Sequence, residues 1–230
     1  METVNIQVIA KMHSDFPTKF GIPRQSNLVE ELESTIVFEP EFRNSDALRG
    51  IEGFSHLWII WQFSQAVRQE WSPTVRPPRL GGNIRLGVFA TRSPFRPNNL
   101  GLSCVKLLGV EHTDNCGTVL RVAGADLMDG TPIFDIKPYI PYSDSFPTAV
   151  GGFTDSAEDF ILDVQFPEHL LSMLPKNKQQ AAIGVLSHAP RPSYQRKPGR
   201  IYGLSFAGFD IRFTVSEKTL TVCEVTKLPL

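Results

Sequence analysis

The run FSHLWIIWQF, residues 54–63, stands out in this sequence for its apolar character. It is almost continuously apolar and rich in β-branched and aromatic residues, and it is short for a helix. We therefore predict a central, fully buried strand here. Runs of similar character follow at Leu102–Gly109, Thr118–Ala125 and Pro132–Tyr139. The link TDNCG between the first two has the composition of a turn, so these two strands are expected to pair.

The spacing of these strands indicates the fold class. No long helical pattern lies between them, so a doubly wound parallel sheet is not expected. The first 145 residues predict an all-β barrel or sandwich with long loops. Ser143–Asp159 is polar and contains a Gly-Gly pair, which is typical of a linker.

The remainder, residues 160–230, has a different pattern. Leucine and alanine recur at helical spacing from Pro167 to Leu186, and Pro175 is expected to divide this stretch into two short helices. Three strand-like runs follow, and we predict a small C-terminal α+β domain. They are Ile201–Ala207, Asp210–Val215 and Leu220–Val225.

Charge is strongly segregated although the net charge is only −1. No Asp or Glu occurs from Trp71 to Val110, while residues 111–170 carry a net −9 and residues 171–230 a net +6. Two basic blocks that converge in space would suit a nucleic acid or a phosphorylated ligand.

The stretch from Thr74 to Ser103 contains five arginines spaced by prolines and glycines. Arg92 is expected to follow a strand at Leu86–Thr91, with Pro94 and Pro97 fixing the turn after it. A rigidly placed arginine of this kind suits bidentate recognition of a carboxylate or phosphate.

The sequence ADLMDGTPIFDIKPY, residues 125–139, carries three carboxylates around a turn at Asp129-Gly130. Turn chemistry alone can explain Asp129. The carboxylates could instead bind ribose hydroxyls or balance a cationic ligand. Arginines and carboxylates together would suit a zwitterionic, sulfonium-bearing cofactor.

Several other classes are disfavoured. The glycines lack dinucleotide and phosphate-loop spacing, His13-Ser14-Asp15 cannot form a triad as sequence neighbours, and the five histidines lack metal-ligand spacing. We therefore expect no metal. The three cysteines are expected to be reduced, and no leader or membrane-length apolar run is found, which favours a cytoplasmic protein without a membrane.

Long blocks of this sequence resemble the TsaA-like family of S-adenosylmethionine-dependent tRNA methyltransferases, which N6-methylate threonylcarbamoyladenosine next to the anticodon. The similar blocks cover nearly the whole chain. They are RQSNLV (24–29), GFSHLWII (53–60), residues 74–103, DLMDGTPIFDIKPYIPY (126–142), HAPRPSYQ (188–195) and RIYGLSFAGFDIRFTV (200–215).

The resemblance implies a mainly β chain. Residues 1–145 would form an antiparallel, cofactor-binding β-barrel unlike the Rossmann methyltransferases, and residues 160–230 a small α+β domain that contacts tRNA. It also implies a homodimer. The cofactor S-adenosylmethionine would contact Pro23, Arg24, Gln25, Ser64, Gln65, Arg92, Leu102, Asp126, Leu127, Met128, Asp129 and Gly130.

Candidates for catalysis and tRNA binding follow from this picture. Asp135 or Asp129 could accept the N6 proton, with Tyr139 or Lys137 orienting the carbamoyl group. The tRNA backbone contacts are expected from Arg76, Arg79, Arg96, Arg191, Arg196, Lys197 and Arg200. A non-catalytic RNA-binding barrel, or a methyltransferase acting on another RNA or a small molecule, stays open as an alternative.

Overall fold

The computed structural model describes residues 2–67, 70–80, 83–155, 161–188 and 199–229. These residues form two units. The first consists of Met1–Ser14, Gln25–Trp71 and Pro94–Tyr139, and the second of Asp15–Arg24, Ser72–Ser93 and Ile140–Leu230. Three parts of the first 145 residues thus belong to the second unit: Asp15–Arg24, Ser72–Ser93 and residues 140–145.

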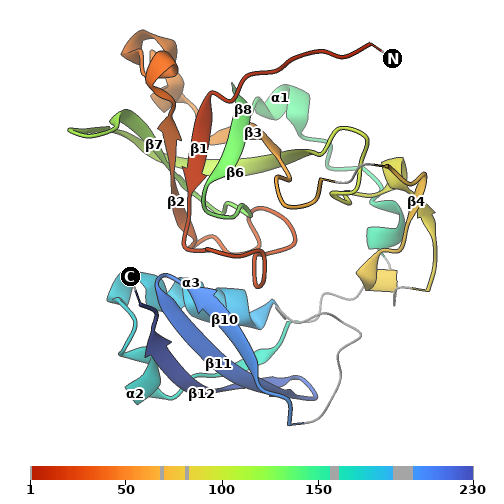
Figure 1. The fold of residues 1–230 in the computed structure, drawn as a ribbon, viewed down its shortest axis with the longest axis vertical. Helices are drawn as coiled ribbons and strands as arrows, with labels where there is room; N and C mark the ends of the chain where they lie inside the picture. Colours follow the sequence, from red (N-terminus) through yellow and green to blue (C-terminus); the bar gives the residue numbers. More distant parts are fainter. Residues whose placement is uncertain (1, 68–69, 81–82, 156–160, 189–198, 230) are drawn as a thin grey trace. The chain divides into compact units, whose positions relative to one another are not determined.

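Six strands build the first unit, and they pair in a ring (Figure 1). The order is β1-β2-β7-β6-β3-β8, and β8 pairs back to β1, so the sheet is a closed barrel with antiparallel neighbours. The strands are β1 (Ala10–His13), β2 (Glu33–Phe38), β3 (His56–Gln62), β6 (Leu100–Thr113), β7 (Gly117–Ala123) and β8 (Thr131–Pro138).

Irregular pairing bends this sheet. The register shifts between Ile60 and Trp61 where β3 pairs with β8, and between Leu107 and Gly109 where β6 pairs with β7. Bulges of this kind increase strand curvature and twist, which a ring of six strands requires. Short 3-10 turns at Pro40–Phe42, Ser45–Leu48 and Ile51–Gly53 connect β2 to β3.

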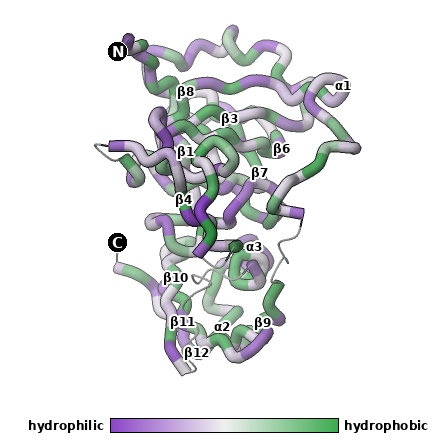
Figure 2. The backbone as a smooth tube through the Cα atoms, turned by 90° about the vertical axis from the view of Figure 1, so that its right-hand side faces the viewer, coloured by the Kyte–Doolittle hydropathy of each residue, from purple (hydrophilic) through white to green (hydrophobic). Residues whose placement is uncertain are grey.

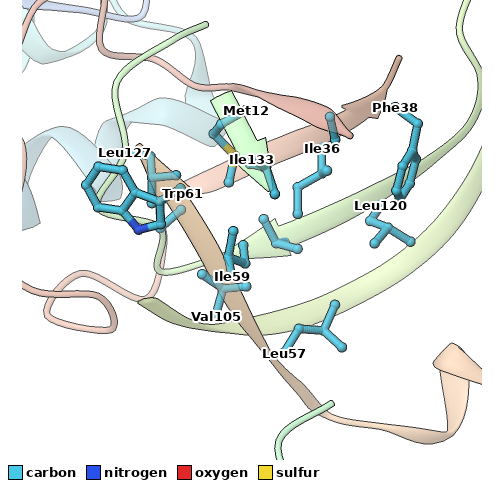
Figure 3. Packing of buried hydrophobic residues seen from close by; sticks show 13 residues of the cluster. Met12, Ile36, Phe38, Leu57, Ile59, Trp61, Val105, Leu120, Leu127 and Ile133 are labelled. Atoms are coloured by element: carbon cyan, nitrogen blue, oxygen red, sulfur yellow. The ribbon is translucent and has the colours of Figure 1, made fainter. Parts of the chain in front are cut away.

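The core of the first unit lies inside the ring, where alternate residues of each strand point inward. Leu57, Ile59 and Trp61 of β3 are buried and Ile60 is only half-buried. Figure 3 shows Trp61 next to Leu127 at one end of this cluster, with Leu57 at the other end. The strand expected at residues 54–63 is therefore present as β3, but the expectation of full burial is wrong, because only one face of β3 is turned toward the core.

Charge pairs link three strands on the outside of the ring. Arg121 of β7 pairs with Glu33 of β2 and with Glu111 of β6, the latter at 3.0 Å. The hydrogen bond to Glu111, and then that to Glu33, raises the pKa of Arg121 above its ordinary value. Because all three side chains are half-exposed, these pairs contribute little stability.

The second unit contains a four-stranded sheet in the order β10-β11-β12-β9. Helix α3 packs its buried face, formed by Ala181, Ala182, Val185 and Leu186, toward this sheet (Figure 1). In Figure 2, hydrophobic and hydrophilic residues alternate along β11, as expected for a sheet covered on one side. The elements are β9 (Asp163–Gln165), α2 (Glu168–Leu171), α3 (Lys176–Ser187), β10 (Tyr202–Phe206), β11 (Phe209–Ser216) and β12 (Thr219–Lys227).

The remaining elements of this unit are short. They are β4 (Thr74–Val75), η4 (Pro78–Leu80), β5 (Leu86–Gly87), η5 (Val88–Ala90), α1 (Pro141–Asp144) and η6 (Gly152–Thr154). The predicted strand Leu86–Thr91 is wrong: strand pairing ends at Gly87, because its partner β4 is only two residues long. A 3-10 turn follows, closed by the hydroxyl of Thr91 donating to the Val88 carbonyl.

Four further predictions are confirmed, whereas β9 is a strand that the sequence pattern does not predict. The mainly-β composition, the β6–β7 hairpin, the helix break at Pro175 and the C-terminal run of three strands are all present.

Candidate functional site

One rim of the first unit collects most of the site residues expected there. At this rim β3 ends beside the start of β6, since Gln62 pairs with Leu100, and β1 ends beside the start of β8, since Met12 pairs with Thr131. After β7 the chain continues along β6 into the segment Asp126–Gly130. We call this end the site rim; it comprises residues 12–14, 62–66, 99–103 and 123–131.

The turn Asp126–Gly130 is anchored to the end of β1. Ser14 donates its backbone N–H to Oδ1 of Asp129 at 3.1 Å and its hydroxyl to the Leu127 carbonyl at 2.8 Å. The N–H of Gly130 donates to the Met12 carbonyl at 2.8 Å. Gly130 has φ +73°, a conformation that favours glycine. The result is a rigid turn with an exposed carboxylate, Asp129, beside His13.

The other carboxylate of this turn is held from the barrel interior. The indole N–H of Trp61 donates to Oγ of Ser103 at 3.0 Å, and that hydroxyl donates to Oδ1 of Asp126 at 2.6 Å. Trp61 and Ser103 are buried and Asp126 is half-buried. A charge-assisted bond in a shielded place is strong, so the Asp126 carboxylate has a fixed orientation.

The loop after β3 is fixed by Asn99, which sequence reasoning missed. Its backbone carbonyl accepts from Phe63 at 2.8 Å, and its side-chain amide donates to the carbonyls of Pro94 at 2.8 Å and Ala66 at 3.3 Å. These contacts place Ser64 and Gln65 at the rim as exposed residues. The sequence signal that could have pointed to Asn99 is the pair Asn98-Asn99 in this proline-rich turn.

Gln25 lies next to a second missed residue, Asn27. Asn27 adopts φ +63°, its backbone N–H donates to the Gly124 carbonyl at 2.8 Å, and its side chain donates to the Cys104 carbonyl at 3.0 Å. A Cβ on Gly124 would lie 2.4 Å from the Asn27 side-chain oxygen. Gln25 is thus held by a loop that docks where β7 ends, next to the first residues of β6.

Asp135 and Leu102 share one cross-strand row on the outside of the barrel. Asp135 of β8 pairs with Ile60 of β3, which in turn pairs with Leu102 of β6. Two strand spacings separate them by about 10 Å. Leu102 is 55% exposed, so its side chain points away from the core. The structure therefore brings one catalytic candidate to the same face as one cofactor candidate.

Lys137 lies farther along β8 and Tyr139 directly after its last residue, toward the opposite rim. Lys137 pairs with Oδ2 of Asp135 at 3.0 Å. Tyr139 contacts the rings of Trp58 and His56, with centroids 5.8 and 6.2 Å away. The three catalytic candidates thus form a row along the outer face of β8 and do not converge on one point.

The second unit contains the other expected residues. Pro23 is buried, whereas Arg24, Arg76, Arg92 and Arg200 are exposed. The guanidinium of Arg200 lies 5.2 Å from the ring centroid of Tyr202. Arg96 is half-buried in the first unit, and Arg79 lies in η4. Arg191, Arg196 and Lys197 lie outside the described residues.

Neither a metal cluster nor a membrane helix is found in the described part of the chain. No group of three or more His, Cys, Asp or Glu residues there could hold a metal ion. Similarly, within those residues no helix has the length and apolar character needed to span a membrane.

Two domain models match the chain, that of the tRNA-methyltransferase O N-terminal domain over residues 11–145 and that of the TrmO C-terminal domain over residues 160–228. The crystal structure of TrmO from P. aeruginosa superposes with a TM-score of 0.80 at 33% identity, covering 99% of this chain and 98% of that one. The fold is therefore that of a β-stranded tRNA methyltransferase.

Sequence relatives agree with this class. The tRNA (adenine(37)-N6)-methyltransferase of Escherichia coli is 40% identical over 226 residues, covering 94% of this chain and 95% of the relative. A Pseudomonas aeruginosa protein provisionally named S-adenosylmethionine-dependent methyltransferase RcsF is 39% identical over 92% of each chain. The chain belongs to the TrmO family.

Proposed function

We propose that this chain transfers a methyl group from S-adenosylmethionine to N6 of adenine 37 in tRNA, and that threonylcarbamoyladenosine is the form of the adenosine it takes. The observation that carries the proposal is the site rim, where an anchored turn presents two carboxylates in fixed orientations. The full-length similarity to the E. coli enzyme supports the choice of reaction.

The residues of the rim fit this cofactor. Asp126 and Asp129 are acceptors for ribose hydroxyls or an ammonium group, and the exposed backbone of the turn offers further polar atoms. Gln25, Ser64, Gln65 and Leu102 would complete the contacts from this unit, and the family resemblance adds Pro23, Arg24 and Arg92 to the expected cofactor contacts. Once bound, S-adenosylmethionine supplies an electrophilic methyl group on a sulfonium sulfur.

A proton must leave N6 when the nitrogen gains the methyl group. We assign its acceptance to Asp135, which shares the outer face of the barrel with Leu102. In the structure the Asp135 carboxylate accepts from the N–H of Ile136 at 2.9 Å and pairs with Lys137 at 3.0 Å. Lys137 therefore orients the base, and Tyr139 offers a hydroxyl farther along the same face for the carbamoyl group.

The same outer face supports a homodimer. Leu100 and Leu102 are 38% and 55% exposed on β6, and Ile60 and Trp58 of β3 lie beside them. An exposed apolar patch of this kind is typical of an interface. We propose that two chains associate through it. We further propose that residues 1–145 bind the cofactor, that residues 160–230 contact tRNA, and that the chain acts in the cytoplasm, where its three cysteines stay reduced.

Nucleoside mass analysis of tRNA from a deletion strain tests the reaction. Loss of the methylated form of threonylcarbamoyladenosine, restored by the wild-type gene but not by an Asp135→Asn variant, is the expected result. An unchanged nucleoside profile in the deletion strain would contradict the proposed substrate. Calorimetry of the purified chain with S-adenosylmethionine separates it from a simple RNA-binding protein, which would release no heat.

A further inference from the structure

The segment Asp15–Arg24 belongs to the second unit although it lies early in the chain. Ser14 before it and Gln25 after it belong to the first unit. The segment ends with Pro23 and Arg24, two of the expected cofactor contacts. The contacts that hold this segment in place therefore determine the conformation in which Pro23 and Arg24 are presented to a ligand.

Its first residue is tied to helix α3 and to the β10–β11 turn. Oδ2 of Asp15 accepts from Nζ of Lys178 at 2.6 Å, and the two side chains are only 15% and 22% exposed. The backbone carbonyl of Asp15 accepts from the N–H of Ala207 at 2.9 Å. A short, largely shielded charge pair is stronger than an exposed one.

The rest of the segment covers the inner face of β10. Phe16 is buried, and its ring centroid lies 5.3 Å from that of the fully buried Phe206. Gly21 has φ +88°, and a Cβ there would lie 2.1 Å from Cδ1 of Leu204. Leu204 and Phe206 are two residues apart and share one face of the strand. Pro23, two residues beyond Gly21, is buried as well.

We infer that Lys178 and Phe206 are positioning residues for cofactor binding, because they hold the segment that ends in Pro23 and Arg24; this rests on the proposed function. A ligand that needs one conformation of a loop binds in proportion to the fraction of chains that have it. In this proposal the C-terminal sheet and α3 position a cofactor-binding segment, in addition to the tRNA contacts proposed for residues 160–230.

Calorimetric titration of the full-length chain with S-adenosylmethionine tests this role. If the ordered fraction of the segment falls to a tenth in Lys178→Met or Phe206→Leu, the Kd rises about tenfold. In methyl-transfer assays the KM for S-adenosylmethionine should rise while kcat at saturating cofactor stays unchanged. Asp15→Asn combined with Lys178→Met should weaken binding no further than either change alone, since both remove the same pair.

The control is Val222→Ala. Val222 is buried on β12, which β11 separates from β10. The Val222→Ala change should lower the melting temperature of the chain and leave the Kd for S-adenosylmethionine unchanged. Unchanged affinity in Lys178→Met and Phe206→Leu, or an equal loss in Val222→Ala, overturns the inference while wild-type binding upholds the proposed function. A wild-type chain that binds no S-adenosylmethionine overturns both.

Discussion

The hydroxyl of Ser103 joins the barrel core to the site rim: it accepts from Trp61 inside the barrel and donates to Asp126 at the edge, over 3.0 and 2.6 Å. A single buried oxygen thereby couples an indole of the core to a carboxylate that we assign to the cofactor. Stability and cofactor affinity should respond together when this oxygen is removed.

Ser103→Ala should destabilise the chain by about 1–3 kcal/mol, because the buried Trp61 N–H loses its acceptor. It should also raise the Kd for S-adenosylmethionine, since Asp126 loses its fixed orientation. Denaturant unfolding and calorimetry measure the two effects. Ser172→Ala is the matched control: Ser172 is exposed and donates to the His169 carbonyl, so a change within about 0.5 kcal/mol is expected. Equal effects of the two changes would contradict the coupling.

Gly101→Ala should destabilise the barrel by about 1–3 kcal/mol through overpacking. An added Cβ would lie 2.3–2.7 Å from three atoms of the Trp61 ring. Gly109→Ala, in the same strand, provides the comparison because nothing lies within 4 Å of its added Cβ. Thermal unfolding of both variants checks this. A smaller loss of stability in Gly101→Ala than in Gly109→Ala would show that the Trp61 ring moves aside at little cost.

Asp135→Asn should lower kcat for methyl transfer with little change in cofactor affinity, since the amide cannot accept the N6 proton but keeps the shape of the side chain. Asp114→Asn, a surface carboxylate in the β6–β7 turn, should leave both unchanged. Single-turnover rates with tRNA and saturating S-adenosylmethionine give the measurement. Full turnover in Asp135→Asn would exclude this residue as the base.

Arg200→Gln should remove about one phosphate contact. The slope of log affinity for tRNA against log salt concentration should therefore become less steep by about one. Arg212→Gln should not, because Arg212 is already paired with Asp210 at 3.1 Å and with Glu224 at 3.2 Å. Binding titrations over a range of salt concentrations distinguish the two. The same assay tests the paired change of Arg196 and Lys197, and an unaltered slope in both cases would remove the C-terminal unit from the tRNA site.

Leu100→Glu should convert a dimer to a monomer, because it places a charge in the apolar face beside Ile60 and Leu102. Leu108→Glu is matched in exposure, at 40% against 38% for Leu100, and Leu108 lies beyond the part of β6 that pairs with β3. It should leave the assembly intact. Light scattering after size-exclusion chromatography reports the mass. A monomeric wild-type chain would contradict the proposed dimer.

Local patterns in the amino-acid sequence were sufficient to predict several elements of this fold. Alternation and apolar runs located β3, β6, β7 and β8, and Pro175 marked the division between α2 and α3, because a proline lacks the backbone N–H that the interior of a helix requires. Composition also singled out the turn Asp126–Gly130. The strand expected at Leu86–Thr91 failed because strand length depends on a partner, and β4 offers only two residues.

Which of these residues come into contact depends on the three-dimensional fold. The bond between Ser103 and Asp126, the row that joins Asp135 to Leu102, and the pairing of Asp15 with Lys178 across 163 positions all arise from strand order and packing. Such contacts leave no periodic trace in the sequence, because each depends on the register of elements far apart in the chain. For that reason the sequence could predict which charged residues belong to the candidate site. The tertiary structure shows which of them lie close enough to act together.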